Sequence, residues 1–135
     1  MKVLAVILLV AGSLAAAPVQ WETSLAAAQQ RATRENKLIF LDVSTGWCSW
    51  CKKLQAETFP SPAGQAALSR VVPLHLETQD AAGKPTRDHA IESQFRVDVF
   101  PTLLILAADG REVARQQGYL PPQQFAAWIG TAAKR

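Results

Sequence analysis

The stretch that decides the fold reads LIFLDVSTGWCSWCKKL and covers residues 38–54. Its first part, Leu38 to Val43, is an apolar run of strand-forming residues, which is typical of a strand covered on both faces. After the short segment Ser44 to Gly46, Cys48 and Cys51 stand three positions apart, where good helix formers begin. The stretch therefore predicts a central strand that leads directly into a helix carrying two cysteines.

The two cysteines suit thiol–disulfide exchange. At the start of a helix, Cys48 lies among unpaired backbone N–H groups at the positive end of the dipole, a position where a thiolate is stabilised. Cys51, one turn later, faces the same side and can close or open a disulfide with Cys48. Exchange needs such a pair, because one thiolate attacks and forms a mixed disulfide that the second thiol then resolves.

Helix and strand patterns predict further elements on both sides of this stretch. The expected helix caps are Thr23 or Ser24, then Ser61, then Thr86 or Asp88. In chain order the sequence predicts a helix over 21–36, the strand over 38–43, a helix over 48–59, a helix over 61–70, a strand over 71–77, a polar loop over 78–85, a helix over 86–95, strands over 102–106 and 111–117, and a last helix from 121.

The order of these elements predicts the fold class. Helices and strands alternate early, which favours parallel crossovers, and the turn signal Asp109-Gly110 predicts a closing antiparallel hairpin. In the last helix Phe125, Trp128 and Ile129 recur at helical spacing and indicate a stripe that faces the core. We expect an α/β fold with a central mixed β-sheet flanked by helices on both faces.

Composition limits the classes of function. The chain has 135 residues, enough for one domain, with 49% hydrophobic and 19% charged residues, which indicates a packed core. A net charge of +3 gives little support for a nucleic-acid partner, and none is expected. The two cysteines cannot form a disulfide-rich scaffold, nor can they alone fill a four-ligand structural zinc site.

The N-terminus has the pattern of a secretory signal peptide. Lys2 precedes an apolar run over 3–14, and small residues Ala15 to Ala17 stand before Pro18. We expect residues 1–17 to be a leader, with cleavage after Ala15 or Ala17, and residues 18–135 to form the mature domain. That domain would be periplasmic or secreted and not inserted in a membrane; a retained anchor is the alternative, although the run is short for a span.

The motif around the cysteines resembles a known family. The run Trp47 to Lys52 is similar to the Trp-Cys-x-x-Cys-Lys motif of the thioredoxin superfamily, and the similarity covers roughly residues 21–130. Asp42 matches the buried acid of that family, the run Phe100 to Thr102 matches its cis-proline segment, and Gly118 before a helix matches its last turn. The resemblance implies the thioredoxin fold.

A longer run around the motif narrows the resemblance. Residues 46–59 look similar to secreted thioredoxin-like proteins and to the C-terminal periplasmic domain of the bacterial transmembrane thiol:disulfide interchange reductase. This implies an exported thiol–disulfide oxidoreductase that acts on cysteines of extracytoplasmic proteins, favours the reducing or isomerising direction, is recycled by a membrane redox partner and uses no flavin, nicotinamide or metal. Ser49-Trp50 replaces the Gly-Pro of thioredoxin, so the redox potential stays open.

The resemblance and the chemistry together assign roles to the catalytic candidates. Cys48 is expected to be the attacking nucleophile and Cys51 the resolving thiol. Asp42 is expected to accept or relay the proton of Cys51, because a carboxylate desolvated in a strand is a suitable base near neutral pH. The alternative for Asp42 is a strand residue held by a neighbouring donor.

Four residues around Cys48 are candidates for contact with the substrate. The resemblance implies that Pro101 is cis and places backbone beside Cys48 for a substrate segment, with Phe100 lining the same groove. Trp47 and Trp50 flank Cys48 and are expected to form an apolar docking surface, with Trp50 the more exposed. The alternative for Trp47 is packing over the start of the helix.

Two other interpretations of the cysteine pair stay open. The pair could be a structural disulfide in a thioredoxin-like binding module, such as a chaperone, without turnover. It could also bind copper or zinc together with His75 or His89 in a metallochaperone, although neither histidine has ligand spacing to the pair. Otherwise both histidines are expected to carry no chemistry.

Overall fold

The computed structural model describes residues 7, 11–12 and 18–134 of the chain. In this part the elements are α1 (Leu25–Glu35), β1 (Ile39–Thr45), α2 (Ser49–Lys53), its π-helical continuation η1 (Leu54–Thr58), α3 (Pro62–Leu68), β2 (Val72–Gln79), α4 (Ala90–Gln94), β3 (Thr102–Leu106), β4 (Glu112–Gln117) and α5 (Pro122–Ala132). The predicted order of helices and strands is confirmed.

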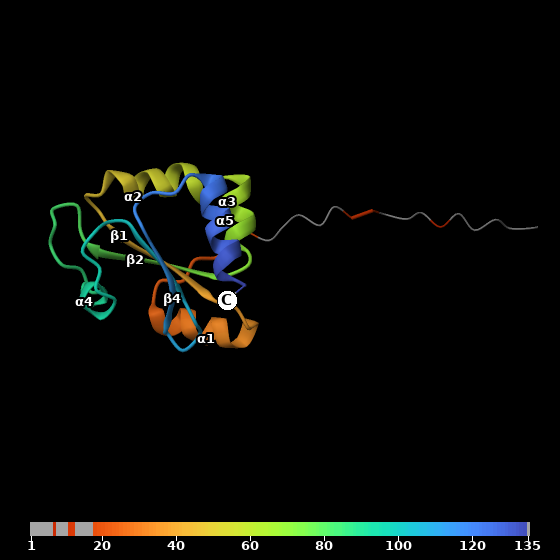
Figure 1. The fold of residues 1–135 in the computed structure, drawn as a ribbon, viewed down its shortest axis with the longest axis horizontal. Coiled ribbons are helices and arrows are strands. Elements are labelled where there is room, and N and C mark those ends of the chain that lie inside the picture. Colours follow the sequence, from red (N-terminus) through yellow and green to blue (C-terminus); the bar gives the residue numbers. More distant parts are fainter. Residues whose placement is uncertain (1–6, 8–10, 13–17, 135) are drawn as a thin grey trace, which may run out of the picture.

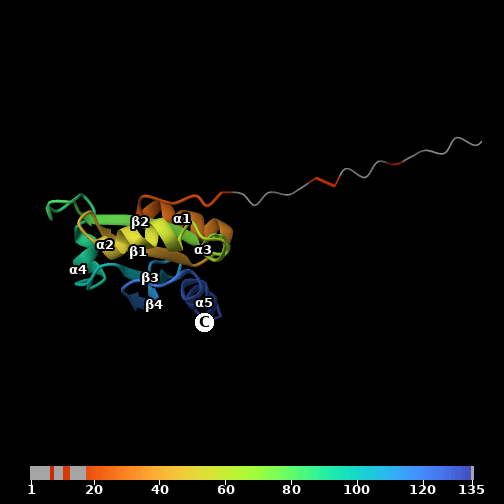
Figure 2. The same cartoon turned by 90° about the horizontal axis from the view of Figure 1, so that it is seen from above.

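The described strands form one mixed sheet in the order β2-β1-β3-β4. β1 pairs parallel with β2, whereas the pairs β1 with β3 and β3 with β4 are antiparallel. Figure 2 shows the strands following one another from β2 at one edge to β4 at the other. The register places Asp42 in β1 between His75 in β2 and Leu103 in β3. The expected central mixed sheet is confirmed.

Helices cover both faces of this sheet, as Figure 1 shows. On one face, called the α1 face, α1 and α4 bury Ala28, Ala32, Ile91 and Phe95 against Ile39, Leu41, Val43, Leu74, Leu76 and Leu104. On the other, called the α2 face, η1, α3 and α5 bury Leu54, Leu68, Phe125 and Ile129 against Phe40, Leu103 and Ile105. Alternate residues of a strand point to opposite faces, so β1 contributes to both cores.

The α2 face is built around aromatic side chains. Phe40 of β1 packs with Phe59 and Phe125 at ring-centroid distances of 5.8 and 5.2 Å. Trp21, which precedes α1, closes the group at 5.0 Å from Phe59. Trp128 is half-buried beside Phe40 at 6.3 Å. The predicted core stripe of the last helix is therefore confirmed, and the aromatic group fixes the helix that follows the cysteines against the sheet.

Two of the three predicted helix caps are found in the structure, and the third is not. Ser24 caps α1 by accepting from the backbone N–H of Ala27, and Ser61 caps α3 by accepting from Gly64. The predicted cap at Thr86 or Asp88 is wrong, because α4 begins at Ala90 with His89 at the cap position and no side-chain bond. Instead the Thr86 hydroxyl accepts from the backbone N–H of Asp88 in a turn before the helix.

Strand β2 is longer than the sequence predicts. Residues 78 and 79 were expected in a loop, but the strand continues to Gln79, which pairs with Thr45 at the end of β1. Thr78 is buried and its hydroxyl donates to the carbonyl of Ser44. Partners in the neighbouring strand thus override the polar composition of this segment.

The predicted leader falls almost wholly outside the described residues, of which only 7 and 11–12 belong to it. Among the described residues, no helix is both long enough and apolar enough to cross a membrane.

Candidate active site

Cys48 and Cys51 meet at the junction of β1 and α2, as the sequence predicts, and form a disulfide. Their Cα atoms lie 5.3 Å apart. Cys48 occupies the cap position of α2, where its Sγ accepts from the backbone N–H of Cys51 at 3.1 Å. Cys48 is 4% exposed and Cys51 is 0% exposed. Cys48 therefore retains a small contact with solvent, whereas Cys51 is fully buried.

Trp50 packs beside a second aromatic residue. Its side chain is 55% exposed, and its ring lies 5.7 Å from that of Tyr119, which follows β4. The ammonium group of Lys53 stands over both rings, at 5.3 Å from Trp50 and 4.9 Å from Tyr119. This arrangement holds an exposed aromatic surface next to the disulfide.

Trp47 packs beside the cis-proline segment. Its side chain is 50% exposed, and its ring meets that of Phe100 edge to face at 5.7 Å. The Phe100–Pro101 peptide bond is cis, as the resemblance implies. The indole N–H of Trp47 donates to the Gln79 side chain at 2.9 Å, and the Gln79 amide donates to Glu92 at 2.9 Å. The structure thus groups Trp47 with Phe100, and Trp50 with Tyr119, a residue the sequence did not single out.

Asp42 is fully buried in the centre of β1. It shares its face with Phe40, two residues earlier, and so lies on the α2 face, which also carries the helix of Cys51. Its Oδ2 is hydrogen-bonded to Nδ1 of His75 at 2.8 Å, and its Oδ1 has no partner among the described residues. One oxygen of the buried carboxylate is therefore held, and the other is free to accept a proton.

His75, which the sequence analysis considered only as a metal ligand or as a residue without chemistry, is the hydrogen-bonded partner of Asp42. Its side chain is 33% exposed, and its ring packs edge to face with Trp21 at 6.3 Å. The hydrogen bond with Asp42 raises the pKa of His75 above its usual value, against the opposing effect of burial; the charges of Asp42 and Glu77 raise the pKa further. The sequence does show that Asp42 and His75 each interrupt an apolar strand. It does not show the register of the two strands, which brings these residues together.

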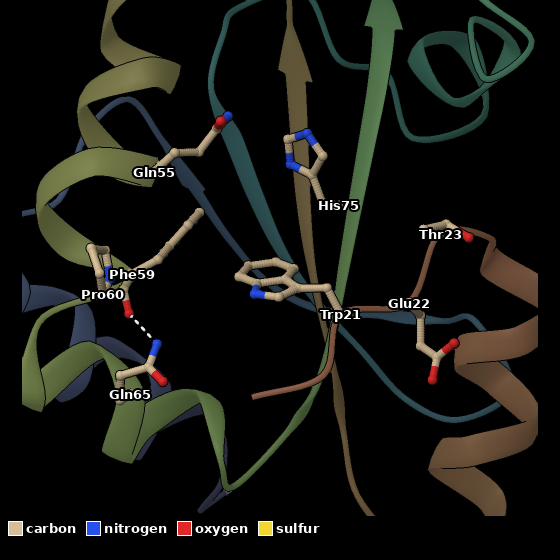
Figure 3. Close-up of a pocket in the computed structure, with 8 residues that line it drawn as sticks. All are labelled: Trp21, Glu22, Thr23, Gln55, Phe59, Pro60, Gln65 and His75. Carbon is tan, nitrogen blue, oxygen red and sulfur yellow. Dashed lines mark hydrogen bonds between the residues drawn. The ribbon is translucent and has the colours of Figure 1, made fainter. Parts of the chain in front are cut away.

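A pocket of about 410 Å³ opens beside His75. Figure 3 shows His75 and Trp21 in its middle, with side chains of η1 and α3 on one side and of the segment before α1 on the other. Its lining residues are Trp21, Glu22, Thr23, Gln55, Phe59, Pro60, Gln65 and His75. The pocket connects the hydrogen-bonded partner of Asp42 with solvent.

Neither histidine lies in a cluster typical of a metal site. Among the described residues, no group of three or more His, Cys, Asp or Glu side chains is placed to hold a metal ion. His75 is bonded to Asp42, and Nε2 of His89 lies 3.6 Å from Glu92. The geometry offers the cysteine pair no third ligand from either histidine.

Comparison with known sequences gives matches over most of the chain. The sequence model of a family described as thioredoxin-like domain matches residues 25–133. The disulfide bond reductase DsbH of Chlamydia pneumoniae is 30% identical over 116 residues, which cover 80% of this chain and 68% of that protein. The thiol:disulfide interchange protein DsbD of Haemophilus ducreyi is 31% identical over 110 residues, 79% of this chain. The chain spans only 19% of the length of that DsbD.

Solved structures share the fold. A structure described as DsbH oxidoreductase superposes with a TM-score of 0.72 and 22% identity, over 87% of this chain and 86% of that one. The oxidised C-terminal domain of DsbD from Neisseria meningitidis gives a TM-score of 0.66 at 22% identity, over 79% and 90% of the two chains. The expected thioredoxin fold is confirmed.

Proposed function

The chain belongs to the thioredoxin-like domain family, and on this premise we propose that it is a thiol–disulfide oxidoreductase that reduces disulfides of extracytoplasmic proteins. One observation carries the proposal: a Cys48–Cys51 disulfide at a strand-to-helix junction, with Cys48 on the solvent side and Cys51 behind it. A merely structural disulfide has no need of this asymmetry, whereas exchange requires one accessible and one resolving sulfur.

The reaction proceeds in two exchanges. In the reduced protein, the Cys48 thiolate attacks one sulfur of a substrate disulfide, and the other substrate sulfur leaves as a thiolate that takes a proton from water. Cys51 then attacks Sγ of Cys48, which releases the second substrate thiol and closes the Cys48–Cys51 disulfide. Two electrons have moved from the protein to the substrate. A dithiol reductant outside the chain must reopen the disulfide before the next turnover.

Asp42 serves the second exchange. The Cys51 thiol must lose its proton to attack, and the buried Asp42 carboxylate lies on the sheet face that carries the helix of Cys51. Its unpartnered Oδ1 supports the role of proton acceptor. When the disulfide is reopened, Asp42 returns the proton to the Cys51 thiolate.

The substrate lies between the two aromatic groups that flank Cys48. Trp47, which packs with Phe100, and Trp50, which packs with Tyr119, are each about half exposed near Cys48 in the sequence. An extended substrate pairs by main-chain hydrogen bonds with the segment that precedes the cis Pro101. Apolar residues beside the substrate cysteine are therefore favoured over charged ones.

The relatives and the sequence of the leader support the proposed direction and compartment. The name of the Chlamydia relative, disulfide bond reductase, supports the reducing direction. Residues 1–17 are removed as a signal peptide, and residues 18–135 act in the periplasm or outside the cell. A free dithiol there is oxidised unless it is recycled, so a membrane redox partner supplies the electrons. Mass spectrometry of the exported protein tests the cleavage site.

The redox equilibrium of the mature domain is the first test. The domain is equilibrated in graded glutathione or dithiothreitol buffers, and free thiols are trapped and counted at each point. We expect a reversible two-electron midpoint near or below about −200 mV; one near about −120 mV would indicate an oxidant instead. Absence of a reversible Cys48–Cys51 couple would refute the oxidoreductase function and leave a binding module.

Trapping tests the order of the two cysteines and identifies substrates. The Cys51→Ser variant keeps the attacking thiol but cannot resolve, so it should accumulate mixed disulfides with its partners through Cys48. The Cys48→Ser variant is the matched control and should trap none, because Cys51 is shielded. Equal trapping by both variants would contradict the assigned roles.

A further inference from the structure

We propose that His75 is a positioning residue for the Cys51 proton transfer: it holds one oxygen of Asp42 by a hydrogen bond and is the group through which this buried carboxylate exchanges protons with water in the adjacent pocket. The inference rests on the proposed oxidoreductase function and adds to it a residue outside the cysteine motif.

His75 and Asp42 are in direct contact, and this contact makes the two oxygens of the carboxylate different. His75 Nδ1 lies 2.8 Å from Asp42 Oδ2, while Oδ1 stays unpartnered in the interior. An isolated ionised carboxylate without water contact is costly, and a bonded imidazolium offsets that cost. His75 thus acts on the oxygen opposite to the one that receives the Cys51 proton.

His75 also gives Asp42 its route to solvent. Asp42 is fully buried, whereas the His75 side chain is 33% exposed and lines the pocket shown in Figure 3. The ring has two nitrogens, and with Nδ1 held by Asp42 it is Nε2 that remains for exchange with water. Trp21 packs against the ring and restricts its orientation.

The proton count closes within the pair. When the Cys51 proton moves to Oδ1 of Asp42, the carboxylate is neutralised and the imidazolium loses the charge that held it. His75 then releases the Nε2 proton to water in the pocket, so the pair has zero net charge before and after. The reverse transfers occur when a reductant opens the disulfide and Cys51 leaves as a thiolate.

The other charges around His75 do not replace it as the cation of this pair. Glu77 on the same strand adds negative charge near the ring. Glu22, on the segment before α1, lines the pocket and is paired with Arg31 of α1 at 3.3 Å. Gln55 of η1 and Gln65 of α3 face the pocket without charge. Among the described residues that line the pocket, His75 is the one basic group.

The pH dependence of turnover tests the proposal. A His75→Gln variant loses both the cation beside Asp42 and the group that passes protons to water, so the acidic limb of the rate profile should move to higher pH. Below that limb the rate should fall about tenfold, with recovery at higher pH. A His75→Lys variant keeps a cation and should move the limb back toward the wild type. His89→Gln is the matched control and should leave the limb in place.

A second measurement needs no turnover. In the oxidised protein, the His75 ring is titrated by NMR in the wild type, Asp42→Asn and His89→Gln. Because the hydrogen bond with Asp42 raises the pKa of His75, we expect the His75 midpoint to fall in Asp42→Asn alone. An unchanged His75 midpoint in Asp42→Asn, together with an unchanged rate profile in His75→Gln, would overturn the inference while leaving the oxidoreductase function intact. Loss of all redox activity in the wild type would instead overturn the function itself.

Discussion

The two faces of the sheet bury different kinds of residue, although β1 supplies both. On the α1 face, Leu41 and Val43 belong to a cluster of buried apolar residues. On the α2 face, Asp42 is the single charged residue that is buried among the described residues, in the layer that also holds the disulfide helix. Burial of a carboxylate costs free energy that apolar packing does not. Apolar burial by β1 on the α1 face therefore stabilises the fold, whereas its Asp42 on the α2 face carries a cost that we attribute to the proposed chemistry.

The strongest way to separate the faces is a substitution on the α1 face. Leu41 is fully buried in the central strand, so Leu41→Ala should lower the free energy of unfolding by about 2–5 kcal/mol through lost burial and a cavity. Denaturant titration measures this loss. The redox midpoint and the pH profile of the folded variant should match the wild type. A changed midpoint would show that the α1 face also tunes the chemistry.

The neighbouring residue should show the opposite behaviour. Asp42→Asn keeps the shape of the side chain but removes the proton acceptor, so the rate of the resolving step should fall about 100-fold near neutral pH. Stopped-flow exchange across about pH 6 to 9 measures this. The free energy of unfolding should change by less than in Leu41→Ala, because no cavity forms. Unchanged exchange rates over this range would reject the role of Asp42 as the proton acceptor.

The same contrast decides what the sequence could predict. The apolar run of β1 and the cysteines behind it predict the strand-to-helix junction, because strand propensity and spacing are local properties. The pairing of Asp42 with His75 is not local. It joins residues 33 positions apart, and a shift of the register by one residue would place His75 on the α1 face.

Tertiary context also explains the smaller discrepancies. Gln79 belongs to a polar segment whose composition predicts a loop. It nevertheless extends β2, because Thr45 pairs with its backbone and the indole N–H of Trp47 donates to its side chain. The helix after Cys51 relaxes into the π-helical η1, where Thr58 bonds to the carbonyl of Leu120, 62 residues away. Helix propensity over 48–59 predicts a helix but not this change of pitch.

A smaller effect should appear in the pH dependence of stability. The hydrogen bond with Asp42 raises the pKa of His75 above its usual value of about 6.5. The contribution of protonated His75 to the free energy of unfolding is therefore fully present below about pH 6.5, and it is lost as the pH rises through the raised pKa. The wild type should exceed His75→Gln in free energy of unfolding by about 1 kcal/mol near pH 6, given the partial exposure of the ring, and by less near pH 9. Urea titrations of both proteins measure the difference, and one that grows with pH would contradict this sign.

The smallest expected effect concerns the link between the two faces through Trp47. Gln79 accepts from the indole N–H of Trp47 and donates to Glu92 of α4, so it ties the half-exposed ring that precedes Cys48 to a helix of the α1 face. In Gln79→Ala the backbone of β2 is kept, but Trp47 gains rotamers that must be reordered on binding. We expect KM for a disulfide-containing protein substrate to rise about two- to threefold, with kcat and the redox midpoint unchanged, because one partly exposed hydrogen bond contributes about 0.5 kcal/mol.

Gln30→Ala, at an exposed position of α1, is the matched control and should leave KM unchanged. A fall in kcat, or a shifted midpoint, would mean that Gln79 reaches the cysteines themselves and that the two faces are not separable at this point.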